Sequence, residues 1–258
     1  MNRQIAALFA GIMLTCLGCA HLPPDNTVTQ IATIDALLAG AYTGVISCGQ
    51  LMQYGDLGIG TFDRLDGEMI LVNGRMHQVR ADGKVYTPDP HTTTPFAAVC
   101  RFTPDIAISV TNALTEPELK QLIDTRIPNQ NQFYAFKITG QFDTIHTRSV
   151  PAQQPPYQPL VKITACQPEF TRTNVSGVII GFRCPPFVKG INMSGYHLHF
   201  LADSEDFGGH LLDFKMVTGI IQANACNRFL LLLPNEASDA GNLDLSRDRS
   251  LELQQVEH

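Results

Sequence analysis

The sequence has few charged residues and no concentration of basic ones. Only 16% of its 258 residues are Asp, Glu, Lys or Arg, and the formal net charge is −6. A nucleic-acid partner is therefore not expected, because no basic stripe is present to neutralise phosphates. With 44% hydrophobic residues, 20 Gly and 16 Pro, the composition favours a compact, strand-rich protein of one large or two small domains over a helical bundle or a disordered chain.

Beyond the N-terminal segment, the sequence lacks the motifs of thiolate zinc sites, of zinc protease helices and of repeat folds. Beyond the N-terminal apolar segment the chain has no Cys-x-x-Cys, which argues against a thiolate zinc site, and it has no His-Glu-x-x-His. No repeat occurs at a solenoid period. The body of the chain holds an odd number of cysteines, which we expect to be buried apolar residues rather than a disulfide framework. They are Cys48, Cys100, Cys166, Cys184 and Cys226.

The N-terminus contains an apolar run that is too short to span a bilayer comfortably. It extends from Ile5 to Leu17 and follows Arg3, as in a secretory signal. Leu17-Gly18-Cys19 resembles a bacterial lipoprotein signal, with Cys19 as the lipidated residue. We therefore expect residues 1–19 to be a signal peptide, residues 20–30 a tether, and the protein to be exported, periplasmic or lipid-anchored. The alternatives are an uncleaved membrane anchor, or a cytoplasmic protein if the signal is not used.

Alternating apolar runs bounded by turn residues predict many strands and few helices. Asn73-Gly74 lies between two such runs and predicts a hairpin, because a type I′ turn needs positive φ at both positions. Thr115, followed three residues later by Glu118, predicts the start of a helix that runs to about Asp124. Separate strands are expected over 133–140, 141–150 and 216–223, and a buried strand over 229–233.

These elements predict a mixed, sheet-rich α/β fold with two β-sheet-based subdomains. A stretch with four prolines, Pro151–Pro159, is the predicted linker between them. The N-terminal sheet subdomain would then cover residues 31–150, and the C-terminal, metal-binding subdomain and tail would cover residues 151–258.

Three histidines occur close together in the second half. His197 and His199 alternate along a predicted strand, so both side chains lie on one face, with Cα atoms about 6.6 Å apart. Phe207-Gly208-Gly209 predicts a turn, and a returning strand would bring His210 beside the pair. Three imidazoles with an open fourth position form a common catalytic zinc site. The alternative is a half-buried strand whose histidines only hydrogen-bond to their neighbours.

Six short segments of this chain resemble, in order and spacing, the bacterial α-acetolactate decarboxylases. The resemblance runs from about Ile31 to the C-terminus. The segments are Gly58-Ile59-Gly60-Thr61-Phe62, Leu65-Asp66-Gly67-Glu68-Met69, Thr93-Thr94-Pro95-Phe96, Thr147-Arg148-Ser149-Val150-Pro151, Gly195-Tyr196-His197-Leu198-His199-Phe200 and Gly208-Gly209-His210.

The resemblance implies a homodimeric zinc (Zn2+) enzyme that converts 2-acetolactate, a 2-hydroxy-3-oxo acid, to (R)-acetoin and carbon dioxide. It places the zinc ligands at His197, His199 and His210. It also implies site roles for the acidic residue Glu68, for Arg148, for Thr61 close to the substrate, and for a glutamate of the C-terminal tail. That glutamate matches Glu257 best, with Glu252 as the competitor.

This set of side chains suits the implied reaction. Zinc is a Lewis acid that can stabilise the enediolate left when carbon dioxide departs, so no organic electron sink is needed. The Arg148 guanidinium can hold a carboxylate or enolate oxygen by paired hydrogen bonds. Glu68 or Glu257 would return a proton to one face of the enediolate, and for this its pKa must be raised.

Two other functions remain open from the sequence. One is a different three-His zinc enzyme, such as a hydrolase, and the other is a non-catalytic exported lipoprotein that binds metal. The non-catalytic protein would leave Glu68 and Arg148 far from the histidines. The decarboxylase instead requires Thr61, Glu68 and Arg148 to converge on the metal from distant parts of the chain.

Overall fold

The computed structural model describes residues 26–235 and 238–257. The predicted signal peptide and Cys19 lie outside these residues. None of the described helices combines the length and the apolar character needed to cross a membrane. The predicted tether ends earlier than residue 30, because Thr27–Ile31 forms a largely buried strand, β1.

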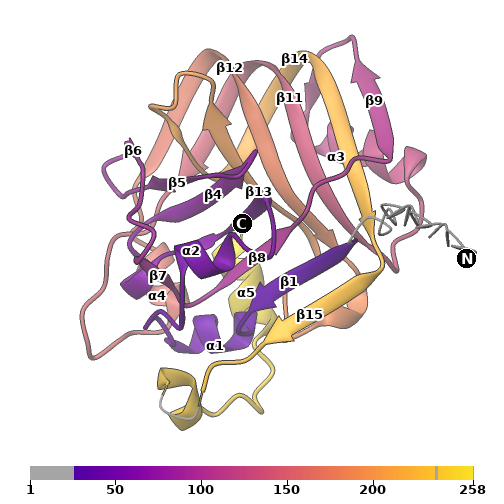
Figure 1. Cartoon of the computed structure of the whole chain (residues 1–258). Coiled ribbons are helices and arrows are strands. Elements are labelled where there is room, and N and C mark those ends of the chain that lie inside the picture. The colour runs from indigo at the N-terminus through magenta and orange to yellow at the C-terminus, as the bar shows by residue number, and fades with distance from the viewer. Residues whose placement is uncertain (1–25, 236–237, 258) are drawn as a thin grey trace, which may run out of the picture.

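Two sheets make up most of the molecule, as the sequence predicted (Figure 1). The seven-stranded sheet has the order β15-β1-β8-β3-β4-β5-β6, in which only the β1–β15 pair is parallel. Its strands are β1 (Thr27–Ile31), β3 (Leu57–Thr61), β4 (Glu68–Val72), β5 (Arg75–Val79), β6 (Val85–Tyr86), β8 (Ala97–Cys100) and β15 (Arg228–Leu232).

The second sheet has six antiparallel strands, in the order β10-β14-β11-β12-β13 with β9 beside β14. β13 also pairs with the start of β14, so it contacts strands on both of its edges. The strands are β9 (Ile106–Val110), β10 (Leu114–Thr115), β11 (Phe133–Arg148), β12 (Glu169–Cys184), β13 (Gly195–Ala202) and β14 (Gly208–Cys226). A two-stranded sheet joins β2 (Ile46–Ser47) to β7 (Thr93–Thr94).

The described residues include five α-helices, most of them short. They are α1 (Ile34–Ala39), α2 (Cys48–Leu51), α3 (Glu116–Arg126), α4 (Leu160–Thr164) and α5 (Ser250–Glu257). Single 3₁₀ turns occur at Asp63–Leu65, Pro186–Val188 and Asp239–Asn242. α4 contacts both α1 and α5, and apolar side chains from the three helices belong to one buried cluster. In Figure 1, α5 leads to the C-terminal end of the chain, which lies near the middle of the view.

Two local predictions are confirmed. Asn73 and Gly74 have φ values of 52° and 72° and connect β4 to β5. Thr115 and Glu118 form a capping box at the start of α3, where the Glu118 carboxylate accepts the Thr115 backbone N–H at 2.8 Å.

The predicted division of the chain at residue 150 does not coincide with the division between the sheets. β9, β10 and β11 precede residue 150 but belong to the six-stranded sheet, and β15 belongs to the seven-stranded one. The two strands predicted over 133–150 are one strand, β11, in which bulges between Gln141 and Thr144 absorb the irregularity. The separate strand predicted over 216–223 is likewise the second half of β14.

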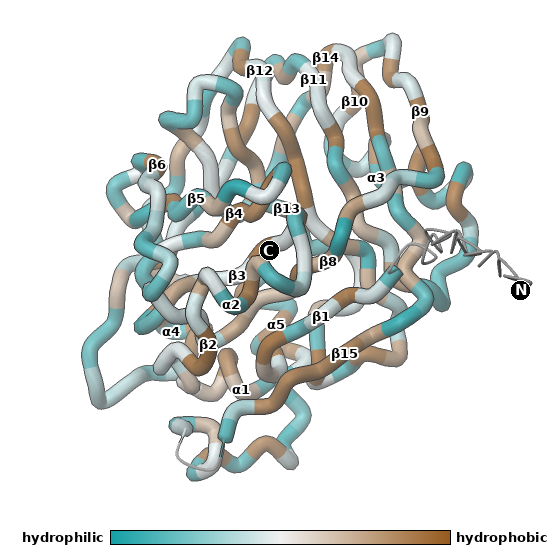
Figure 2. Tube along the Cα trace, viewed as in Figure 1, coloured by the Kyte–Doolittle hydropathy of each residue, from teal (hydrophilic) through white to brown (hydrophobic). Residues whose placement is uncertain are grey.

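The apolar run over 229–233 was predicted to be buried, and this is wrong. The run appears brown in Figure 2, yet β15 is an edge strand with β1 on one side only. Leu230 is 42% exposed and Leu233 67%. A run of apolar residues does not by itself distinguish a central strand from an edge strand.

Candidate metal centre

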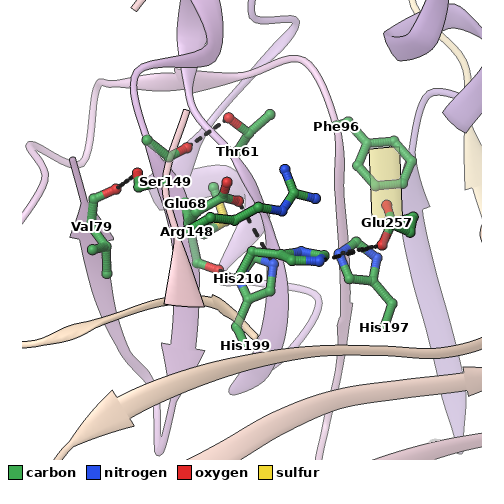
Figure 3. A network of polar contacts seen from close by, with 12 residues as sticks. Thr61, Glu68, Val79, Phe96, Arg148, Ser149, His197, His199, His210 and Glu257 are labelled. Carbon is green, nitrogen blue, oxygen red and sulfur yellow. Dashed lines mark hydrogen bonds and ion pairs between the residues drawn. The ribbon is translucent and has the colours of Figure 1, made fainter. Parts of the chain in front are cut away.

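The three histidines predicted from their spacing meet at one point. His197 and His199 lie on β13, and His210 is the cross-strand partner of His199 on β14. The ring centroids are 5.0–5.3 Å apart, and one nitrogen from each ring lies within 4.8 Å of the other two. All three side chains are buried. Figure 3 shows the imidazoles facing one another.

The turn before His210 is not where the sequence predicted it. The chain reverses over residues 203–206, and Gly208 and Gly209 already belong to β14. A Cβ on Gly208 would come within 2.4 Å of the Phe200 carbonyl oxygen, and one on Gly209 within 2.5 Å of the Arg148 carbonyl oxygen. The glycines therefore allow neighbouring strands to approach closely, which brings β11 and β13 against the His210 strand.

The His199 imidazole is in the state that metal binding requires. His199 Nδ1 lies 2.9 Å from the Met69 carbonyl oxygen, and donating to it leaves Nε2 with its lone pair. That Nε2 atom is buried and has no hydrogen-bond partner among the described residues. Burial lowers the pKa of His197, and burial together with the nearby His197 lowers the pKa of His199 well below its ordinary value. A neutral ring with an unpartnered nitrogen, as at His199, fits a metal ion.

Two carboxylates approach the histidines from other elements. Glu68, on β4 of the seven-stranded sheet, has Oε2 3.7 Å from His199 Nε2. Glu257, at the end of α5, has Oε2 3.6 Å from His210 Nε2 and 3.9 Å from His197 Nε2. The competitor Glu252 lies 3.8 Å from Arg247 and does not line the cavity. The structure therefore places Glu257, and not Glu252, beside the histidines.

Arg148 enters the site from the end of β11, where it is the cross-strand partner of His210. Its side chain is almost fully buried. Nη1 donates to Gln167 Oε1 at 2.6 Å, and Nη2 donates to the Val256 carbonyl oxygen at 2.7 Å. Nε has no hydrogen-bond partner among the described residues.

These side chains surround a cavity of about 40 Å³ between the two sheets. Thr61 lines it and donates its hydroxyl hydrogen to the Gly67 carbonyl oxygen at 2.7 Å. The rest of the wall is mainly apolar, formed by Ile34, Leu37, Leu65, Phe96, Val150, Leu160 and Val256. A cavity of this size accommodates an ion and about one water.

All seven residues singled out from the sequence line this one cavity. Sequence reasoning missed three backbone or amide groups that hold them: the carbonyls of Met69 and Val256 and the side chain of Gln167. Every residue has a backbone carbonyl, so the residue type does not reveal which carbonyls hold the site. Gln167 lies in the loop after α4, outside any pattern.

Comparison with known proteins identifies the family. The sequence model of the alpha-acetolactate decarboxylases matches residues 28–247. The chain belongs to this family. A relative from Methanosarcina mazei is 41% identical over 92% of this chain and 84% of its own, and one from Methylococcus capsulatus is 38% identical over 91% and 90%. The crystal structure of alpha-acetolactate decarboxylase from Bacillus subtilis strain 168 has a TM-score of 0.87 at 34% identity, covering 90% of this chain and 99% of that one.

The carboxyl of Glu68 should make the stability of the metal-free protein depend on pH. Burial raises the pKa of Glu68 from 4.5 to about 7, against the opposing effect of Arg148. Because the folded-state pKa is raised, ionisation destabilises the fold, and this cost grows between pH 4.5 and about 7 and is complete above it. We expect metal-free Glu68→Gln to gain stability relative to the parent as pH rises, by about 3 kcal/mol at pH 8.

Urea unfolding of both metal-free proteins between about pH 5 and pH 8 measures this difference. Groups that titrate far from the cavity contribute equally to the two proteins and cancel. A difference in the free energy of unfolding that does not change with pH would show that Glu68 titrates normally.

Proposed function

We propose that this protein is a zinc enzyme that decarboxylates 2-acetolactate to (R)-acetoin and carbon dioxide. The observation that carries the proposal is the convergence of three histidines, Glu68, Arg148 and Glu257 on one buried cavity. A non-catalytic metal-binding protein would not need a buried arginine and two carboxylates there. Family membership supports the substrate.

The three histidines are the residues that would hold the metal. When bound, it would supply the positive charge that stabilises the electrons left on the substrate as carbon dioxide departs. Neutral imidazole ligands leave that positive charge undiminished. With such an electron sink, the chain needs no organic cofactor.

Arg148 would orient the substrate, and one of the two carboxyl groups would supply the proton. The unpartnered Nε of Arg148 and its remaining N–H bonds offer donors to the substrate carboxylate. Binding that group too tightly would oppose its departure, so Arg148 mainly fixes orientation. Burial raises the pKa of Glu68 to about 7 in the metal-free site, and this carboxyl is the candidate that would deliver a proton to one face of the enediolate. Glu257 is the second candidate donor.

Entry of the substrate would involve movement of α5. The substrate has about nine non-hydrogen atoms and exceeds a space that accommodates an ion and about one water. Glu257 separates the cavity from an open hollow of about 850 Å³ lined by the loop near Lys189 and by residues 245–254. We infer that the substrate enters from this hollow when the last turn of α5 swings outward.

We also propose that the protein is exported, with a lipid anchor at Cys19, and that it forms a homodimer. The first proposal is supported by the apolar segment and the Leu17-Gly18-Cys19 motif. The second is supported by the resemblance to the family, and the exposed Leu230 of edge strand β15, with Leu233 just after it, offers a surface for a second copy.

The deciding experiment uses the chain without its first 19 residues. Purified protein, with zinc or after chelation, is given racemic acetolactate while carbon dioxide release and acetoin chirality are followed. We expect zinc-dependent formation of (R)-acetoin. A folded, zinc-loaded protein that releases no carbon dioxide would contradict the proposal and favour a different reaction on the same three histidines.

A further inference from the structure

The Arg148 guanidinium is held by two uncharged oxygens. One belongs to the Gln167 side-chain amide, at 2.6 Å from Nη1, and the other is the Val256 carbonyl, at 2.7 Å from Nη2. The arginine side chain is 3% exposed. Among the ion pairs between described residues, none within 4.0 Å includes Arg148. Buried arginines normally pair with a carboxylate, so two neutral acceptors are an unusual arrangement.

A carboxylate is available nearby but is directed elsewhere. Glu169 lies opposite Arg148 in the β11–β12 ladder. Its side chain turns outward instead and lies 2.9 Å from His146 Nε2 at the surface. The group that faces Arg148 is thus the amide of Gln167, which has the shape of a glutamate without its charge. The amide satisfies an N–H group without adding a charge to the carboxyl groups of Glu68 and Glu257, which line the same cavity as Arg148.

We propose that Gln167 is a positioning residue that aims the Arg148 guanidinium at the cavity while keeping its charge available for the substrate carboxylate. The inference rests on the proposed function, because that function supplies an anionic substrate. Two fixed contacts on the outer nitrogens restrict rotation of the planar group, and the Nε–H remains for the ligand. A glutamate at position 167 would keep the orientation but cancel the charge.

The test compares an anionic and a neutral ligand of similar shape. Calorimetry on zinc-loaded protein would measure the binding of 2-hydroxyisobutyrate, which carries a carboxylate, and of acetoin, which does not. We expect Gln167→Glu to weaken 2-hydroxyisobutyrate binding at least about tenfold and to leave acetoin binding and zinc content unchanged. Gln158→Glu adds the same charge at an exposed position before α4 and should change neither affinity.

A second variant separates orientation from charge. Gln167→Met removes the acceptor without adding a charge, so we expect weaker 2-hydroxyisobutyrate binding, unchanged acetoin binding and a lower kcat. Gln167→Met also tests whether Gln167 positions Arg148 if the Gln167→Glu protein does not fold. Parent-like affinity for 2-hydroxyisobutyrate in the folded variants, or an equal loss for both ligands, would overturn the proposal.

Binding and activity measurements on the parent protein distinguish a failure of this inference from a failure of the proposed function. If it binds 2-hydroxyisobutyrate but does not decarboxylate acetolactate, the proposed reaction fails and the role of Gln167 stands. If it decarboxylates acetolactate but does not distinguish the anion from acetoin, the role of Gln167 fails.

Discussion

His199→Ala should abolish both zinc retention and decarboxylation. His199 is the histidine whose tautomer is set by the Met69 carbonyl, and its Nε2 has no partner among the described residues. Removing it leaves two imidazoles, too few for a stable site. Loss of a group that only orients a ligand weakens metal binding about 10- to 100-fold, so loss of the ligand itself should cost more than about 100-fold. Zinc content after dialysis and the rate of carbon dioxide release measure both effects.

His77→Ala is the matched control. His77 is also buried, and burial lowers its pKa too, but it lies on β5 and does not line the cavity. This variant should lose stability through its unfilled space while keeping zinc and its rate per folded molecule. Full activity of a zinc-free His199→Ala protein would remove the three histidines from the mechanism.

The histidine pair was predictable because strand geometry has a period of two residues. Residues 197 and 199 share a face in any strand, and the nearby return of the chain brings His210 to them. The position of the turn was not predictable from Gly-Gly, because glycine serves close strand approach as well as turns. In this protein Gly208 and Gly209 have the first of these roles.

The convergence of the other residues could not be derived from local pattern. Glu68 and Thr61 lie on a different sheet from the histidines, and only the packing of β3 and β4 against β12 and β13 brings them close. Their site roles in the sequence analysis came from the resemblance to the family. Glu257 lies beyond the range matched by the family model, near a chain end where disorder is common, yet it is buried beside two histidines.

The boundaries of the long strands also could not be predicted from the sequence. A strand of 16 residues such as β11 contains a glycine, Gly140, that resembles a strand end. In the structure Gly140 faces Gly219 across the ladder, where a Cβ would meet the Thr218 carbonyl oxygen at 2.3 Å. The glycine pair thus lets two long strands continue past each other, and the strand boundary predicted there does not exist.

Arg148→Lys should keep zinc and lose most of the rate. The histidines that would hold the metal are untouched, so metal content should equal that of the parent. A lysine ammonium is a single point and cannot contact Gln167, the Val256 carbonyl and a substrate carboxylate in one plane. Removal of one oriented donor at a reacting centre costs about 100- to 1,000-fold in kcat, and we expect a fall in kcat/KM of that order.

Arg183→Lys provides the comparison for a buried arginine with a structural role. Arg183 is 2% exposed, and it donates to Asp124 at 2.6 Å and to the Ile127 carbonyl oxygen at 2.9 Å, with no contact to the cavity. Its replacement should lower the Tm and leave the rate per folded, zinc-loaded molecule nearly unchanged. If Arg148→Lys behaved in the same way, with lower stability and parent-like kcat/KM, the arginine would be a structural link between β11 and α5, and orientation of the substrate would have to come from another group.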